Sequence, residues 1–307
     1  MKVLVLGSNG LVGKHLQEIV SSDIINEWIF VSRSDADLTD WFQVKHLFEK
    51  HNPSHVINLA AFVGGLYKNM SQGVEFFEKN SLINMNVMKA STKTKKLVSI
   101  MSTCIFPDNI SYPITEKDLH LGPPHSSNEG YSYAKRMIDV LGRAYNKEYG
   151  TNYVSVIPGN LYGQHDNFNL EDSHVIPALI HKMKIAQTSE NPMIVFGTGK
   201  ALRQFTHASD LAKCLVWVVS NYEDTEPLII SSEEECAIHD IVEYIRDELQ
   251  FTGEILYDTD KSDGQLRKTI SSEKWNKLCQ DIPFRSLKDG LKETIQWFLH
   301  SYDVCRK

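Results

Sequence analysis

Short apolar runs and amphipathic segments alternate over the first half of the chain. The runs are rich in β-branched residues and occupy residues 3–6, 28–31, 55–59, 96–101 and 153–157. The segments between them, at 11–20, 41–50, 80–91 and 131–149, have apolar residues at helical spacing, with Asp40 a plausible N-cap for the second. Strands that alternate with helices form parallel sheets covered on both faces. The pattern therefore predicts an α/β fold with a doubly wound parallel sheet.

The rhythm changes after about residue 158. Loops rich in Asn, Asp and Gly alternate with a short apolar run at 194–196 and with helical patterns at 175–184, 208–220, 238–249 and 287–298. We expect a nucleotide-binding domain at 1–158 and a smaller, mixed α/β substrate region at 159–307. Some segments of the second region are expected to return to the first domain.

A glycine turn joins the first strand to the first helix. Gly7, Gly10 and Gly13 suit a tight turn, a close approach of backbone to a pyrophosphate, and close helix–strand packing. The first helical residues, Leu11 and Val12, would offer unpaired N–H groups at the positive end of the helix dipole. The context predicts a Rossmann-type dinucleotide site. The alternative is a tight turn with no ligand.

The end of the second strand bears on the choice of dinucleotide. A carboxylate there favours the 2′-hydroxyl of NAD, and a cation favours the 2′-phosphate of NADP. The strand ends in Val-Ser-Arg-Ser, so Arg33 precedes the first acid, Asp35. A guanidinium pairs well with phosphate, and we therefore predict NADP(H). The alternative is a surface arginine in a loop.

The motif Tyr-Ser-Tyr-Ala-Lys suggests acid–base chemistry. Tyr131 and Lys135 are four residues apart and share one face of a helix, whereas Tyr133 has Met137 at that spacing. An ammonium near a phenol is expected to lower the phenol pKa, and Tyr131 could then exchange a proton with a substrate oxygen. The alternative is an exposed Tyr/Lys pair without a catalytic role.

A hydroxyl near the end of the preceding strand completes the pattern. Ser102 is the predicted partner of the substrate carbonyl, with Thr103 in reserve. The glycine turn, this hydroxyl and the Tyr/Lys pair occur in the order and spacing that resemble the extended short-chain dehydrogenase/reductase family. We therefore interpret the chain as an NADP-dependent oxidoreductase.

Further short sequence motifs resemble one branch of that family, the GDP-L-fucose synthases, over nearly the whole chain. These motifs lie at 60–65, 102–107, 130–135, 160–163, 165–168, 173–177, 197–199, 203–205 and 261–264. The resemblance implies conversion of GDP-4-keto-6-deoxy-D-mannose to GDP-L-fucose by epimerisation at C3 and C5, followed by reduction of the C4 ketone. It places Cys104 as the base and His174 as the acid of the epimerisation.

The same resemblance implies contacts for both ligands. Lys135, Asn160 and Leu161 would line the nicotinamide end of the cofactor. Lys182 and Arg203 would neutralise the nucleotide diphosphate, while Phe196 and Asp263 would contact the guanosine or the sugar. Homodimerisation is implied as well, through the helices that follow the third and fourth strands.

Two alternatives stay open. One is a C4 reductase, with or without epimerase activity, for another GDP-4-keto-6-deoxy sugar such as a heptose, because one extra carbon alters only the pocket shape. The other is a non-catalytic NADP-binding sensor, although such a protein would not need the Tyr/Lys pair.

Composition excludes several other classes. The net charge of −7 argues against nucleic-acid binding, and no apolar stretch has the length of about 20 residues that crosses a membrane. The five cysteines form no CxxC pair, so neither a disulfide framework nor a metal site is expected. A reducing, cytoplasmic location without a signal peptide fits this pattern.

Overall fold

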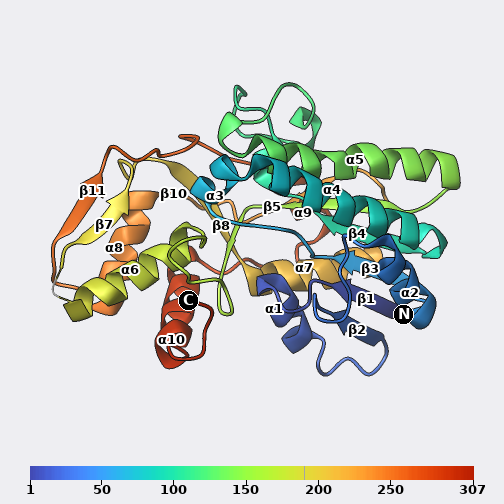
Figure 1. The fold of residues 1–307 in the computed structure, drawn as a ribbon, viewed down its shortest axis with the longest axis horizontal. Coiled ribbons are helices and arrows are strands. Elements are labelled where there is room, and N and C mark those ends of the chain that lie inside the picture. The colour runs from blue at the N-terminus through green and yellow to red at the C-terminus, as the bar shows by residue number, and fades with distance from the viewer. Residues whose placement is uncertain (190) are drawn as a thin grey trace.

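A six-stranded, all-parallel sheet organises the computed structural model, which describes residues 1–189 and 191–307 (Figure 1). The strand order is β2-β1-β3-β4-β5-β9. The strands are β1 (Lys2–Leu6), β2 (Glu27–Val31), β3 (His55–Asn58), β4 (Lys96–Ile100), β5 (Tyr153–Pro158) and β9 (Leu228–Ile230). The predicted doubly wound parallel sheet is thus confirmed.

Helices cover both faces of this sheet, because successive strand residues point to opposite sides. On β1, Leu4 and Leu6 belong to the core under α2 (Trp41–His51), α4 (Gly73–Ala90) and α5 (Glu129–Tyr149). Val3 and Val5 belong to the core under α1 (Leu11–Ile19), α7 (Ala208–Asn221) and α9 (Glu273–Leu278). Figure 1 shows α4 and α5 running side by side along one face.

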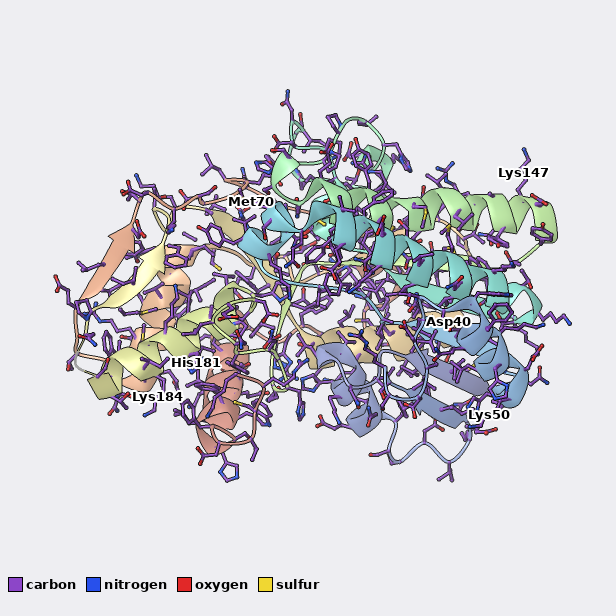
Figure 2. All side chains as sticks on the ribbon, in the orientation of Figure 1. Asp40, Lys50, Met70, Lys147, His181 and Lys184 are labelled. Carbon is purple, nitrogen blue, oxygen red and sulfur yellow. The ribbon has the colours of Figure 1, made fainter. Side chains whose placement is uncertain are left out.

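The first residue of one helix is set by its local sequence, and that of another by contacts with residues distant in the sequence. The α2 helix begins where its sequence predicts, since the Asp40 carboxylate accepts a hydrogen bond of 2.8 Å from the Phe42 N–H. Figure 2 labels Asp40 and Lys50 at the two ends of this helix. The α4 helix, in contrast, begins at Gly73 rather than near residue 80. Its added turns are held by buried Phe76, whose ring packs 4.8 Å from that of Phe62.

The other end of the molecule has a separate core. The helices α6 (Val175–Ser189), α8 (Ile238–Leu249) and α10 (Leu287–His300) pack there against two small sheets. One sheet pairs β7 (Met193–Phe196) with β11 (Ile255–Asp258), and the other has the order β10-β8-β6. Its strands are β6 (Asn160–Tyr162), β8 (Leu202–His207) and β10 (Glu235–Ala237). The short helix α3 (Leu66–Ser71) lies between β3 and α4 in sequence.

The chain crosses between the two ends more than once. After β8 it returns to the large sheet, where α7 packs beside α1 and β9 pairs with β5. The region after residue 158 is therefore not one contiguous body. Among the helices that the structure describes, none combines the length and apolar character needed to cross a bilayer.

Candidate active site

Two adjoining cavities lie beyond the carboxyl ends of the large sheet's strands, where open α/β sheets bind ligands. The first has a volume of about 690 Å³ and the second about 370 Å³. They meet at Ser102, Tyr131, Asn160 and His174, which line both. The junction therefore brings the expected hydride-transfer groups together with one of the expected epimerisation groups.

The glycine turn forms one wall of the first cavity. Gly7 has a φ of +82°, and a Cβ there would lie 2.8 Å from the Ala60 nitrogen. A Cβ on Gly13 would lie 2.5 Å from the Ser8 carbonyl oxygen, so only glycine lets α1 approach this closely. Gly10, Leu11 and Val12 line the cavity at the helix N-terminus. This cradle fits a dinucleotide phosphate group.

Arg33 lines the same cavity beside Ser32. The carboxylate of the nearby Asp35 is already hydrogen-bonded within the protein. It accepts hydrogen bonds from the Ser32 N–H at 2.8 Å and from the Ser32 hydroxyl at 2.7 Å. These bonds lower the pKa of Asp35. Its charge is thus committed to the turn, whereas Arg33 lines the cavity and suits an anionic group such as a 2′-phosphate.

Lys135 and Tyr131 share one face of α5, as their spacing predicts. The Lys135 ammonium donates a hydrogen bond of 2.8 Å to the Ile100 carbonyl and lies 6.0 Å from the centre of the Tyr131 ring. Burial lowers the pKa of Lys135 to about 8. Burial also raises the pKa of the Tyr131 phenol, and the electrostatic effect of Cys104 raises it further. The expectation that the ammonium lowers this pKa is therefore wrong, because desolvation of the phenolate dominates.

The choice between the two tyrosines of the motif is decided by position. Tyr131 lines both cavities, and Phe76 packs edge-on against its ring at 6.1 Å. Tyr133 is exposed and stacks near the Arg136 guanidinium instead. The phenol at the cavity junction is thus Tyr131, held in place by an aromatic contact from α4.

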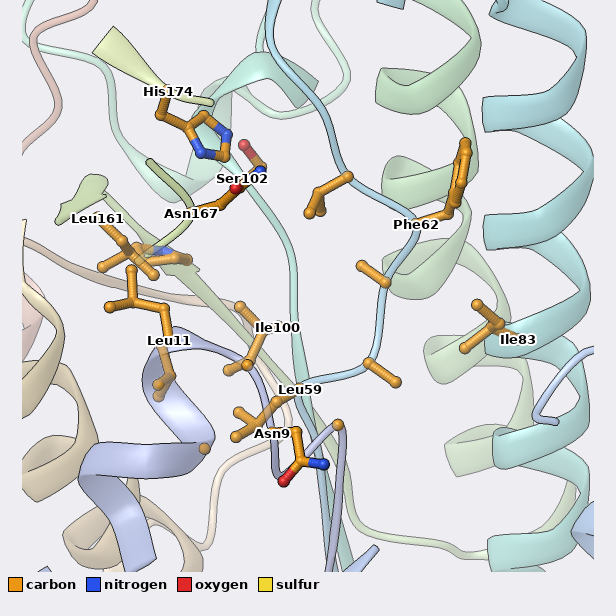
Figure 3. Close-up of a pocket in the computed structure, with 18 of the residues that line it drawn as sticks. Asn9, Leu11, Leu59, Phe62, Ile83, Ile100, Ser102, Leu161, Asn167 and His174 are labelled. Carbon is orange, nitrogen blue, oxygen red and sulfur yellow. The ribbon is translucent and has the colours of Figure 1, made fainter. Parts of the chain in front are cut away.

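The expected epimerisation pair meets at the second cavity. Cys104 is 6% exposed, lies in a single 3₁₀ turn (Thr103–Ile105) after β4, and lines this cavity. His174 immediately precedes α6 and lines both cavities. Figure 3 shows His174, Asn167 and Ser102 at one end of the first cavity and Asn9 and Leu59 at the other. A thiol and an imidazole from different elements thus face one ligand space.

The expected diphosphate and base contacts line the second cavity. The Lys182 ammonium lies 3.4 Å from the centre of the Phe196 ring and donates a hydrogen bond of 3.2 Å to the Ile194 carbonyl. Burial lowers the pKa of Lys182 and that of Arg203. Both cations are partly desolvated and gain from an anionic ligand.

Asp263 also lines the second cavity, but its carboxylate is already engaged. It accepts hydrogen bonds of 2.8 Å from both the N–H and the hydroxyl of Thr198. These bonds fix the turn between Gly197 and Gly199, which both have positive φ. Asp263 therefore shapes the wall that carries Phe196, in addition to any contact with a ligand.

Three charged cavity residues are not among those that the sequence predicts as site residues. Lys268 lines the second cavity, and burial lowers its pKa. Asp166 and Arg306 line the first. Each is a single charged residue outside any periodic pattern, although Asp166 lies within one of the motifs, residues 165–168, that resemble the family. Within residues 1–189 and 191–307, no group of three or more His, Cys, Asp or Glu side chains is arranged for a metal ion.

Comparison with known proteins identifies the family. The sequence profile of the NAD dependent epimerase/dehydratase family matches residues 3–230. A GDP-L-fucose synthase from Dictyostelium discoideum is 49% identical, over 99% of this chain and 97% of its own. The chain belongs to the GDP-L-fucose synthase branch of the NAD dependent epimerase/dehydratase family. The profile match ends in β9, so in this family the returning segments α7 and β9 belong to the shared unit.

Solved structures of relatives agree with the fold. A GDP-L-fucose synthetase from Naegleria fowleri bound to NADP superposes with a TM-score of 0.93 and 45% identity, covering 100% of this chain and 95% of that one. MlghC, a GDP-mannoheptose C4 reductase from Campylobacter jejuni with NADP bound, has a TM-score of 0.86 and 25% identity, with coverage of 97% and 98%. The family assignment therefore extends over the substrate region as well as the large sheet.

Proposed function

We propose that the protein is an NADPH-dependent epimerase/reductase that converts GDP-4-keto-6-deoxy-D-mannose to GDP-L-fucose. The observation that carries this proposal is the junction of the two cavities, where Tyr131 and Ser102 adjoin both ligand spaces and Cys104 and His174 face the second. The 49% identity to a GDP-L-fucose synthase supports the choice of sugar nucleotide.

NADPH fits the first cavity through this chain's own groups. Gly7, Gly10 and the N-terminus of α1 would hold the pyrophosphate, and Arg33 the 2′-phosphate. When bound, the cofactor supplies the hydride that reduces the C4 ketone. Asn160 lines the cavity at its junction with the second one and, with the adjacent Leu161, would position the nicotinamide.

Epimerisation needs one group to remove a proton beside the C4 ketone and another to return a proton on the opposite face. Cys104 would remove the proton, and His174 would deliver one from the start of α6. The ketone oxygen gains negative charge as the proton leaves. Ser102, at the junction of the cavities, would stabilise that oxygen by donating a hydrogen bond.

Reduction needs a proton for the same oxygen. Because burial keeps the Tyr131 phenol protonated, Tyr131 suits the role of proton donor in this direction of reaction. Lys182 and Arg203 would hold the nucleotide diphosphate in the second cavity. Binding energy from the nucleotide then orients the sugar at the junction.

Incubation with GDP-4-keto-6-deoxy-D-mannose in deuterated water separates the two chemical steps. The native protein with NADPH is expected to yield GDP-L-fucose with deuterium at C3 and C5, measured by mass spectrometry and NMR. Tyr131→Phe is expected to exchange these protons and to bind NADPH normally, with reduction at least about 10²-fold slower. Cys104→Ser and His174→Asn are expected to lose exchange.

Two results would contradict the proposal. Reduction by the native protein without deuterium at C3 or C5 would indicate a C4 reductase, the activity named for the structural relative MlghC, a GDP-mannoheptose C4 reductase. Undiminished reduction by Tyr131→Phe would remove the catalytic assignment and would reopen a role as a non-catalytic NADP-binding sensor.

We also propose a cytoplasmic homodimer. All five cysteines are free, which suits a reducing compartment. The outer surfaces of α4 and α5 expose a row of large apolar side chains, namely Val74, Phe77, Leu82, Met85 and Val140. Several large exposed apolar side chains on one pair of helices are typical of protein interfaces.

A further inference from the structure

Asp166 is a buried carboxylate with an unused acceptor in the cofactor cavity. Its side chain lines that cavity, and the residue is only 4% exposed. One oxygen, Oδ1, accepts a hydrogen bond of 2.7 Å from the Asn167 N–H. The other, Oδ2, is buried and has no hydrogen-bond partner among the described residues. A buried carboxylate oxygen without a partner is costly, so a donor from a ligand would stabilise it.

Arg306 reaches the same cavity from the segment that follows α10. Its Nη2 donates a hydrogen bond of 2.7 Å to the His165 carbonyl. Its own carbonyl accepts one of 2.7 Å from the Phe168 N–H. The segment is thereby fastened to the loop that carries Asp166. The Arg306 side chain is exposed, so its charge is available to a ligand in the cavity.

Asp166 and Arg306 do not serve as hydrogen-bond or ion-pair partners for each other. Among the described residues, Asp166 forms no ion pair with Arg306 or with His174, although both side chains lie close enough to lower the pKa of the Asp166 carboxyl. Burial has the larger and opposite effect on that pKa. The arrangement leaves an acceptor and a cation side by side, which suits a ligand with both a donor and a negative charge.

The loop lies against the helix that begins at the glycine turn. The His165 Nε2 is 3.0 Å from Glu18 Oε1, and its ring centre is 5.5 Å from that of His15, both on α1. Figure 3 shows Leu11 at the start of α1 next to Leu161, with Asn167 beyond it in the direction of His174. Asp166, next to Asn167 in the chain, and Arg306 line the cavity that also contains the glycine turn and the junction with the second cavity.

We propose that Asp166 and Arg306 are cofactor-binding residues, with the segment after α10 forming part of the cofactor site. Arg306 pairs with the pyrophosphate, and Asp166 Oδ2 accepts a hydrogen bond from a hydroxyl or amide donor on the nicotinamide half. This inference rests on the NADP(H) assignment of the proposed function, but not on the identity of the sugar.

The test measures the dissociation constants of NADPH and of adenosine 2′,5′-bisphosphate by isothermal titration calorimetry, without any turnover. Asp166→Asn is expected to weaken NADPH binding about tenfold, as the loss of one charge-assisted hydrogen bond would. It should leave adenosine 2′,5′-bisphosphate unaffected, because that fragment lacks the nicotinamide half. Arg306→Met is expected to weaken NADPH binding by a similar factor, and Lys307→Met, the matched loss of charge on the adjacent residue, to leave it unchanged.

Several outcomes would overturn the inference. They are an unchanged NADPH affinity in Asp166→Asn, equal weakening of both ligands by that variant, or equal effects of Arg306→Met and Lys307→Met. Circular dichroism checks that each variant folds, and exposed Arg306 provides a test even where the buried substitution unfolds the chain. A native protein that binds no NADPH would instead contradict the proposed function itself.

Discussion

Desolvation is the dominant effect on the two residues at the centre of the site. Lys135 is buried, and among the described residues its ammonium has one hydrogen-bond acceptor, the Ile100 carbonyl. This explains why its pKa falls to about 8 while that of Tyr131 rises. At neutral pH the pair is therefore a cation beside a neutral phenol, the protonation state needed to donate a proton to an oxygen.

The lowered pKa of Lys135 predicts the alkaline limb of the pH profile. The ammonium is charged below about pH 8 and neutral above it, so kcat/KM for reduction is expected to fall as pH rises through about 8. Lys135→Arg, which stays charged, is expected to lose this limb even if its maximal rate is lower. Steady-state rates of NADPH oxidation across pH check the prediction, and an unchanged limb in Lys135→Arg would contradict it.

The lowered pKa of Lys135 also affects the free energy of unfolding, which is expected to rise with pH whereas kcat/KM falls. Between about pH 8 and the ordinary value of 10.5, the unfolded chain holds a proton on this lysine that the folded chain has released. Stability therefore gains from Lys135 as pH rises through this window. In urea unfolding, Lys135→Met should remove that part of the pH dependence.

At the scale of elements, the contact between α4 and α5 positions Tyr131, the proposed proton donor. A Cβ on Gly130 would lie 2.3 Å from the Gly73 carbonyl oxygen, so the two helix starts approach as closely as backbone allows. Farther along, the Asn84 amide donates a hydrogen bond of 3.1 Å to the Ala134 carbonyl. Tyr131 follows Gly130 directly, and its place at the cavity junction depends on this packing.

Gly130→Ala is expected to separate the helix starts. We expect the free energy of unfolding to fall by about 1–3 kcal/mol, as for other overpacked sites, and reductase activity to fall because Tyr131 moves. Gly73→Ala is the matched control, since nothing lies within 4 Å of a Cβ there. Alanine in that helical position should leave stability unchanged or raise it. Equal effects of the two variants in urea unfolding would refute the packing argument.

At the scale of the whole molecule, no layer of the described residues covers the outer face formed by α4 and α5 (Figure 1). Val74 at the start of α4 is 73% exposed, and the other apolar residues of this face follow at helical spacing. The opposite side of the same helices is fully packed on the sheet. A second copy of the chain would remove this apolar surface from water.

Phe77→Glu is expected to convert a dimer to a monomer, because it places a charge in the apolar face. Sedimentation velocity on the purified protein measures the change. Ile25→Glu is the control, since Ile25 is 85% exposed in the loop after α1, away from this face. A native protein that is monomeric at micromolar concentration, or one that Ile25→Glu also dissociates, would contradict the proposed dimer.

Local pattern was sufficient for the features that depend on neighbours in sequence. The parallel strands from β1 to β5, the glycine turn and the shared face of Tyr131 and Lys135 could all be predicted, because alternation and helical spacing are set over a few residues. More distant site residues, such as Cys104 and His174, came from the family resemblance, and the structure places them around one cavity. Their chemical roles stay predictions.

Tertiary structure alone decided the rest. It extended α4 back to Gly73, added short strands such as β6 and β9, and returned α7 to the large sheet. It also set the pKa directions of Tyr131 and Lys135 and brought Asp166 and Arg306 to the first cavity. The physical reason is common to all of these. Burial, desolvation and the pairing of short strands depend on groups far apart in the chain, and no window of sequence contains both partners.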